Sequence, residues 1–234
     1  IKSVIWCPGA GQTGFNALGE IVAGEVNPSG HSADTFVYDL TAAPYFNNIG
    51  DFAYTNADSV GYTVASQAGG DAKLVPPHFV NYVEGIYVGY RYYQTAGVPV
   101  AFPFGYGLSY TSFAYSELKA DARSVTLTVT NTGSRAGAEI AQLYVAKADA
   151  AVFRPEKELK GFAKVFLQAG ECKTVTIPLD DKAFRYWNVK TDRWETEGGS
   201  YQLLVGASVQ DIRLRAEVPV QGTGAPDPYA GKAV

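Results

Sequence analysis

The sequence contains no methionine among its 234 residues, and it begins with Ile1. Because a genetic start supplies a methionine, we expect this chain to be a processed or excised piece of a longer parent. Only two cysteines are present, Cys7 and Cys172, and two cannot make a disulfide framework. A cysteine can act as a nucleophile when a histidine activates it, and His31 and His78 are the two histidines. We expect both cysteines to be small buried side chains instead.

Strong charge and long apolar runs are also missing. The formal net charge is −4, so no basic surface points to nucleic acid or to an anionic membrane. No apolar run approaches the length that crosses a bilayer, and no signal peptide is visible. The absence of a signal peptide and of a disulfide framework favours a cytoplasmic location, unless the parent chain carries a signal of its own. Hydrophobic residues make up 47% of the chain, which is ample for a packed core.

The first forty residues predict a strand, a helix and a second strand. Residues 3–6 are a short apolar run, and residues 35–38 are another. Between them, apolar residues recur at helical spacing from Phe15 to Val22, and Gly24 ends the pattern. A strand, a crossover helix and a second strand are the unit of a parallel sheet covered by helices.

The residues from Gly9 to Gly14 match the pattern G-x-G-x-x-G. In a strand–turn–helix context this pattern binds the pyrophosphate of a dinucleotide, and Asp39 at the end of the next strand would receive a ribose hydroxyl. The alternative is a tight turn whose glycines let helix and strand pack closely. A single short unit with no second nucleotide-binding half favours the packing interpretation.

The rest of the chain divides into an irregular stretch and a strongly periodic one. Residues 41–101 show no sustained period apart from a short helix predicted over residues 83–93, and such long excursions are usually functional or lie against another domain. After Tyr110, apolar residues alternate with polar ones in five runs between turn residues, as in Val125, Leu127 and Val129. This alternation predicts an antiparallel β-sandwich of about seven strands over residues 112–218, followed by a Gly-, Pro- and Ala-rich linker over residues 219–234.

Three groups of motifs together resemble glycoside hydrolase family 3, the β-glucosidase-like enzymes. Residues 3–6 with GQTGFNALGEIVAGEVNPSG (residues 11–30) resemble a late segment of the family's α/β sandwich domain. FPFGYGLSYTSFAYS (residues 102–116) is similar to the connector that leads from that domain to a C-terminal β-sandwich. The family's fibronectin type III-like domain is resembled by VTNTGSRAGAEIAQLYV (129–145), RPEKELKGFAKVFLQAGECKTVTIPL (154–179) and YQLLVGAS (201–208).

The resemblance implies a fold and a division of the chain. Residues 1–111 would be the C-terminal segment of the α/β sandwich domain with its connector. Residues 112–218 would be an all-β fibronectin type III-like, immunoglobulin-like sandwich, and residues 219–234 a linker or tail. The tail is similar to that of members with permuted domain order, so we expect the parent chain to continue beyond Val234.

The resemblance also implies a function that this chain does not perform alone. Family members hydrolyse β-linked glucosides with retention, by means of two carboxylates about 5 Å apart. The nucleophile comes from a separate (β/α)8 barrel domain, and the acid/base comes from a loop of the α/β domain upstream of this segment. Neither sequence context is present, so no catalytic residue is assigned, and the expected partners are the barrel domain, the remainder of the α/β domain and the β-glucoside. No metal-ligand spacing appears, and family hydrolysis needs no cofactor.

Three residues are candidates for outer contacts to substrate. Ligands bind beyond the carboxyl ends of strands in α/β sheets, so Trp6 and Gln12 in the first turn would border the active-site cleft. Glu84 lies among aromatic residues, and its alternative role is an ion pair with Arg91 at a domain interface.

The aromatic run over residues 102–110 has two interpretations. Its rings either join the two domains or form a platform that stacks on a sugar, and their close spacing along an irregular chain favours the first. In that interpretation Pro103 stiffens the crossing, while Gly105 and Gly107 permit close approach of the backbone. For the whole chain, the remaining alternatives are a stand-alone carbohydrate-binding module and a dinucleotide-binding oxidoreductase fragment.

Overall fold

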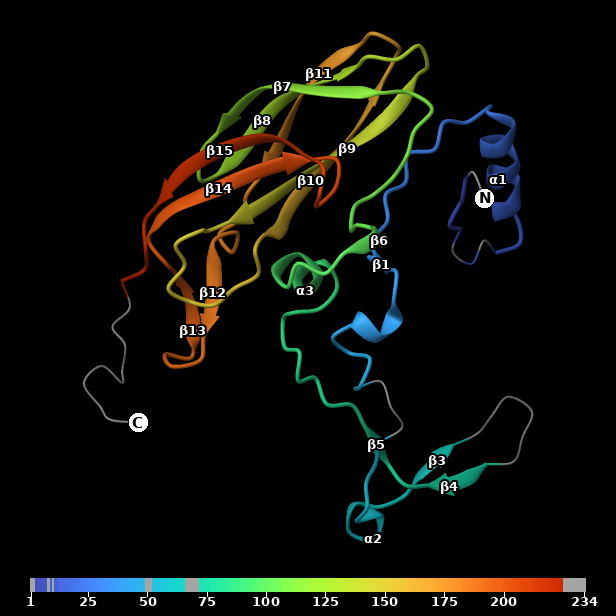
Figure 1. Ribbon diagram of the computed structural model, residues 1–234, viewed down its shortest axis with the longest axis vertical. Coiled ribbons are helices and arrows are strands. Elements are labelled where there is room, and N and C mark those ends of the chain that lie inside the picture. The colour runs from blue at the N-terminus through green and yellow to red at the C-terminus, as the bar shows by residue number, and fades with distance from the viewer. Residues whose placement is uncertain (1–2, 8, 10, 49–51, 66–71, 225–234) are drawn as a thin grey trace.

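The computed structural model describes residues 3–7, 9, 11–48, 52–65 and 72–224. Figure 1 shows a large β-sandwich formed by the C-terminal half, an N-terminal segment that runs beside it, and an arm that projects away from both. Among the helices of the described residues, none has the length and apolar character needed to span a membrane.

The sandwich consists of seven strands in two antiparallel sheets. Its strands are β7 (Phe113–Ala120), β8 (Ser124–Asn131), β9 (Gly137–Ala146), β10 (Glu158–Leu167), β11 (Cys172–Pro178), β14 (Gly199–Gly206) and β15 (Ile212–Val220). One sheet has the order β11-β8-β7 and the other β10-β9-β14-β15, with antiparallel pairing throughout. The predicted antiparallel β-sandwich is confirmed.

Alternation of side chains along the strands explains why this part folds as it does. In β8 the side chains of Val125, Leu127 and Val129 are completely buried between the sheets. Thr126 lies on the outer face, where its hydroxyl is 3.0 Å from that of Thr176 on β11. Each buried aliphatic side chain stabilises the fold by about 1.5–3 kcal/mol relative to its exposed state, so the period-two pattern fixes which face turns inward.

A small hairpin of β12 (Arg185–Asn188) and β13 (Arg193–Thr196) extends from the sandwich. Buried Glu195 holds its turn, because its carboxylate accepts hydrogen bonds from Asn188 at 2.8 Å and from the Thr191 hydroxyl at 2.5 Å. These bonds, the one from Asn188 foremost, lower the pKa of Glu195. Trp187 and Trp194 pair across the hairpin with ring centroids 5.6 Å apart, and both stay about half exposed.

The N-terminal segment forms the predicted helix but not the predicted parallel sheet. Helix α1 (Gly14–Ala23) ends at Gly24, whose φ of 77° provides the left-handed conformation of a helix C-cap. Residues 3–7 form no strand, and the next strand, β1 (Phe36–Val37), pairs antiparallel with β6 (Val100–Phe102). A strand needs a hydrogen-bonding neighbour, and the described residues place none beside residues 3–7.

The irregular stretch forms a short helical turn and the projecting arm. The 3₁₀ helix η1 (Leu40–Ala42) is followed by β2 (Phe52–Ala53), which pairs with β5 (His78–Phe79). Beyond this pair lie α2 (Ala57–Val60) and a hairpin of β3 (Thr63–Ala65) with β4 (Lys73–Val75), and Figure 1 shows them farthest from the sandwich.

The prediction of a helix over residues 83–93 is wrong about where the helix begins and ends. Helix α3 comprises only Tyr90–Thr95, and residues 83–86 form turns instead. Gly85 and Gly89 have φ values of 56° and 55°. These left-handed conformations interrupt a right-handed helix, so the helix begins only after the second glycine.

Candidate functional site

Trp6 and Gln12 lie in the N-terminal segment, before α1. Trp6 is 59% exposed, and the edge of its ring contacts Phe36 at a centroid distance of 6.2 Å. Gln12 is exposed in the turn that precedes the helix. Both side chains are therefore available to a ligand or to another domain.

The dinucleotide pattern lacks the structural context that it requires. Residues 3–7, the described residues before it, form no strand, and Thr13 at the start of α1 makes no side-chain capping bond. Ala10 of the pattern lies outside the described residues. The carboxylate of Asp39 accepts hydrogen bonds from the backbone and side chain of Thr41 and so begins η1. The bond from the Thr41 hydroxyl is the main cause that lowers the pKa of Asp39. This local role accounts for Asp39 without a ribose.

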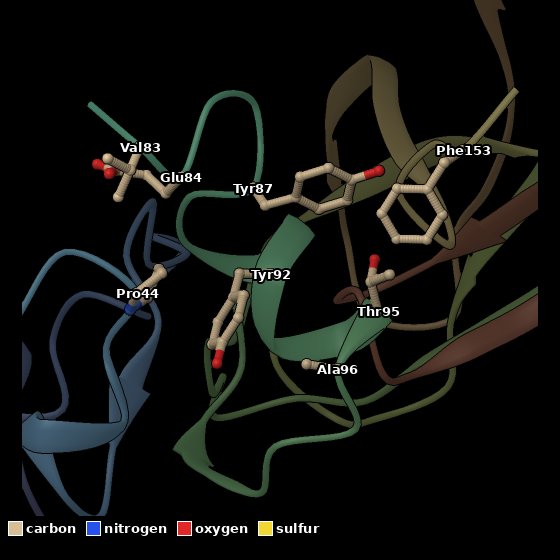
Figure 2. A pocket seen from close by; sticks show the side chains of 8 residues that line it. All are labelled: Pro44, Val83, Glu84, Tyr87, Tyr92, Thr95, Ala96 and Phe153. Atoms are coloured by element: carbon tan, nitrogen blue, oxygen red, sulfur yellow. The ribbon is translucent and has the colours of Figure 1, made fainter. Parts of the chain in front are cut away.

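Glu84 lies at an open cleft of about 470 Å³ that Figure 2 shows from close by. Its carboxylate accepts a hydrogen bond from the Asn48 amide at 3.2 Å. The alternative ion pair with Arg91 is not formed in the described structure. Tyr87 and Phe153 lie at the other end of the cleft, with ring centroids 5.1 Å apart.

The described residues that line the cleft include one acid. The lining residues are Pro44, Val83, Glu84, Tyr87, Tyr92, Thr95, Ala96 and Phe153. Glu84 is the single acid among these, whereas retaining hydrolysis needs a second carboxylate about 5 Å away. No contact within the described chain joins Glu84 to Trp6 or Gln12, so the structure does not bring the three candidates together.

Cys7 and Cys172 are both exposed, so the prediction that they are buried is wrong. Cys172 is on β11, at a position where the side chain points to the outer face of a two-layered sandwich. Within the described ranges, no three His, Cys, Asp or Glu side chains are placed together to hold a metal ion.

A polar cluster that the sequence analysis missed joins the N-terminal segment to the sandwich. His31 Nδ1 lies 2.6 Å from the carbonyl oxygen of Gly105 and 3.1 Å from that of Ala207. The buried amide of Gln142 donates to the same two oxygens, and its own oxygen accepts from Tyr144 at 2.6 Å. In this cluster, His31 comes from the N-terminal segment, Gly105 from the connector, and Gln142 and Tyr144 from β9 of the four-stranded sheet.

Asn27 makes a second junction from the motif Asn-Pro-Ser-Gly. Its amide nitrogen donates to the Ala136 carbonyl at 3.0 Å, and its oxygen accepts from Ser109 and from the backbone of Tyr110. The Tyr110 hydroxyl donates to the carbonyl of Ile21 at 2.8 Å. One asparagine thus ties helix α1, the connector and the sandwich together.

Phe104 of the connector packs on the outer face of the four-stranded sheet. Phe104 contacts Tyr90 at 4.5 Å between ring centroids, and Tyr90 contacts Tyr144 at 6.2 Å. Burial raises the pKa of both Tyr90 and Tyr144. Leu204 and Val209 complete this cluster. These contacts favour the joining role of the rings over an exposed sugar platform.

Comparisons with known proteins give these features a family. The fibronectin type III-like domain matches residues 139–209. The chain is 42% identical over 231 residues to thermostable β-glucosidase B of Acetivibrio thermocellus, and 40% identical over 223 residues to an exo-α-(1→6)-L-arabinopyranosidase of Bifidobacterium longum. These matches cover 95% and 93% of this chain, but only 27% and 26% of the relatives' own lengths.

Solved structures agree with these relatives. The crystal structure of a family 3 β-glucosidase from Bifidobacterium adolescentis matches with a TM-score of 0.78 at 38% identity, over 95% of this chain and 30% of that one. β-Glucosidase 3B of Thermotoga neapolitana in complex with α-D-glucose matches with a TM-score of 0.74 at 33% identity, over 90% of this chain and 27% of that one. The chain belongs to glycoside hydrolase family 3 and corresponds to the C-terminal region of its β-glucosidases.

Proposed function

We propose that this chain is the non-catalytic, supporting portion of a larger enzyme that hydrolyses β-linked glucosides with retention. The observation that carries this proposal is the extent of the match, which takes in 95% of this chain and about a quarter of a β-glucosidase. The two catalytic carboxylates would come from the barrel domain and from the upstream part of the α/β domain. This chain would hold those parts in place.

The N-terminal segment would complete the α/β sandwich domain of that enzyme. It exposes an unusual number of apolar side chains for a soluble surface, with Val4 71%, Phe15 67% and Val22 68% exposed. Residues 4–7 are also apolar, and no strand lies beside them in the described structure. Missing neighbours in the α/β domain would pair with this segment and cover helix α1.

Trp6, Gln12 and Glu84 would be outer contacts to the sugar. Trp6 and Gln12 follow the apolar run that would be a strand of the α/β sheet, and ligands bind beyond the carboxyl ends of such strands. An exposed tryptophan ring packs well on the C–H face of a pyranose. Glu84 would accept a hydrogen bond from a hydroxyl at the aromatic cleft.

We expect the purified chain to release no nitrophenol from a chromogenic β-glucoside or α-L-arabinopyranoside. A nucleophile and a general acid must be held together for fast chemistry, and neither context is present. A chimera of β-glucosidase B of A. thermocellus, with this chain in place of its own matching region, should retain most of its turnover. A chimera that folds but is inactive would contradict the supporting role. If the isolated chain turned over substrate and Glu84→Gln abolished that turnover, the catalytic site would lie in this chain.

In the same chimera, Trp6→Ala and Gln12→Ala should raise KM by roughly three- to tenfold while kcat changes little. The reason is that an outer contact binds substrate and transition state equally. Val22→Ala, on the face of α1 that the α/β domain would cover, is the control for a general loss of stability. Unchanged KM in both variants would remove these residues from the site.

A stand-alone carbohydrate-binding module is the second candidate. The exposed pair of Trp187 and Trp194 favours it, because aromatic rings held rigidly on a hairpin suit a sugar face. Retardation of the isolated chain on a polysaccharide gel, lost in Trp194→Ala, would support this candidate.

A further inference from the structure

A second cavity of about 470 Å³ lies on the outer face of the four-stranded sheet. Gln202 and Leu204 of β14 and Ala146 of β9 line it from the sheet. The loop between β9 and β10 lines it with residues 147, 148, 150 and 152–157. Thr95 at the end of α3 closes one side, and its hydroxyl accepts a hydrogen bond from the backbone of Glu156 at 3.0 Å. The cavity is therefore built by three elements that contact one another.

The lining carries an excess of positive charge. Lys147, Arg154, Lys157 and Arg215 all line the cavity, against the single carboxylate of Glu156. Four cations and one anion leave a formal excess of three positive charges, in a chain whose net charge is −4. Like charges that gather in one place repel each other unless an anion lies between them.

Protein carboxylates satisfy only part of this charge. Lys157 pairs with Glu156 at 2.9 Å, and Arg154 pairs with Glu197 at 3.2 Å. Within the described residues, Lys147 and Arg215 have no carboxylate partner, although Lys147 lies over the ring of Tyr201.

The Nε–H group of Arg154 is a hydrogen-bond donor without an acceptor in the described chain. This group is inaccessible to solvent, and the side chain as a whole is 13% exposed. A buried donor without an acceptor is costly, and an arginine fork matches an oxyanion well.

An aromatic ring lies at the mouth of the cavity. Phe153 is 79% exposed and lines both this cavity and the Glu84 cleft. Figure 2 shows its ring beside Thr95 and facing Tyr87. An exposed ring next to a cationic recess offers a face for the C–H groups of a sugar and charge for an acidic substituent.

We propose that this cavity binds an anionic saccharide, with its oxyanion held by Lys147, Arg154 and Arg215 and its ring packed on Phe153. The shared ligand chemistry is a pyranose that carries a carboxylate or a phosphate. The site shares Phe153 and Thr95 with the Glu84 cleft, but Lys147, Arg154 and Arg215 line this cavity only. The proposal does not depend on the hydrolysis of a β-glucoside.

Isothermal titration of the full chain tests this proposal with D-glucuronate, D-glucose 6-phosphate, inorganic phosphate and neutral D-glucose. We expect one of the two anionic sugars to bind at least tenfold more tightly than glucose, with an affinity that falls as salt increases. Comparison of glucuronate with glucose 6-phosphate tells which oxyanion is preferred. Equal affinity for glucose and for both anionic sugars, or no binding of any of them, would overturn the proposal.

Three variants assign the binding to this cavity. Arg215→Gln should weaken binding of the preferred sugar about tenfold, and Phe153→Ala should weaken it while leaving the affinity for inorganic phosphate unchanged. Arg193→Gln removes an exposed arginine of the β12–β13 hairpin and serves as the matched control. Thermal melts verify that each variant folds, and a folded Arg215→Gln variant with wild-type affinity would also overturn the proposal.

Discussion

Replacement of Gly105 by alanine should lower the free energy of unfolding by about 3–5 kcal/mol, because two costs add. Gly105 has a φ of 80°, a conformation that alanine rarely adopts. A Cβ atom at this position would lie 2.0 Å from the side-chain oxygen of Gln142. Gln142 is 3% exposed and bound to two carbonyls and to Tyr144, so it cannot move aside without breaking those hydrogen bonds.

Gly97 provides the matched control for the backbone cost alone. Its φ is 65°, and nothing lies within 4 Å of a Cβ atom added there. Gly97→Ala should therefore cost only about 1–2 kcal/mol. Chemical denaturation of both variants measures the difference, and equal losses would show that contact with Gln142 carries no weight. The double variant Gly105→Ala, Gln142→Ala should lose less stability than the two single variants lose together, because removal of the glutamine side chain relieves the overlap.

The sandwich and the close approach at the connector could be predicted because their signals are local. Val125, Leu127 and Val129 face the core because adjacent residues of a strand point to opposite sides, whatever the rest of the chain does. The prediction that Gly105 and Gly107 allow close backbone approach is confirmed, since an added Cβ at Gly107 would lie 2.5 Å from the carbonyl oxygen of Gly30.

The candidate site was less predictable because its contacts join distant residues. His31 meets Gln142, which is 111 residues away, and neither residue has a local pattern that signals the other. The cationic cavity likewise collects Lys147, Arg154 and Arg215 from a loop and a strand. The helix predicted over residues 83–93 was misplaced because periodicity counts apolar side chains and ignores the φ values that Gly85 and Gly89 adopt.

The double variant Phe104→Ala, Tyr106→Ala should lose about 4 kcal/mol of its free energy of unfolding. This loss is smaller than that for two fully buried rings, because the Phe104 and Tyr106 side chains are half-buried. Phe104 packs on Tyr90 above the four-stranded sheet, and Tyr106 contacts Phe102 at 5.3 Å between ring centroids. Loss of both rings would remove apolar contacts on each side of the connector at once.

The same variant tests whether the two halves of the chain are joined or merely tethered. We predict a domain boundary near residue 112, with the connector rings as the contact between the halves. Wild-type protein should then melt in one transition, and the double variant should show a separate, earlier transition of the N-terminal segment. Leu108→Ala is the control within the same segment, because Leu108 is 72% exposed and its loss should change stability by less than about 0.5 kcal/mol. A double variant that melts like the wild type would mean that the hydrogen bonds of Asn27 and His31, rather than the rings, hold the two halves together.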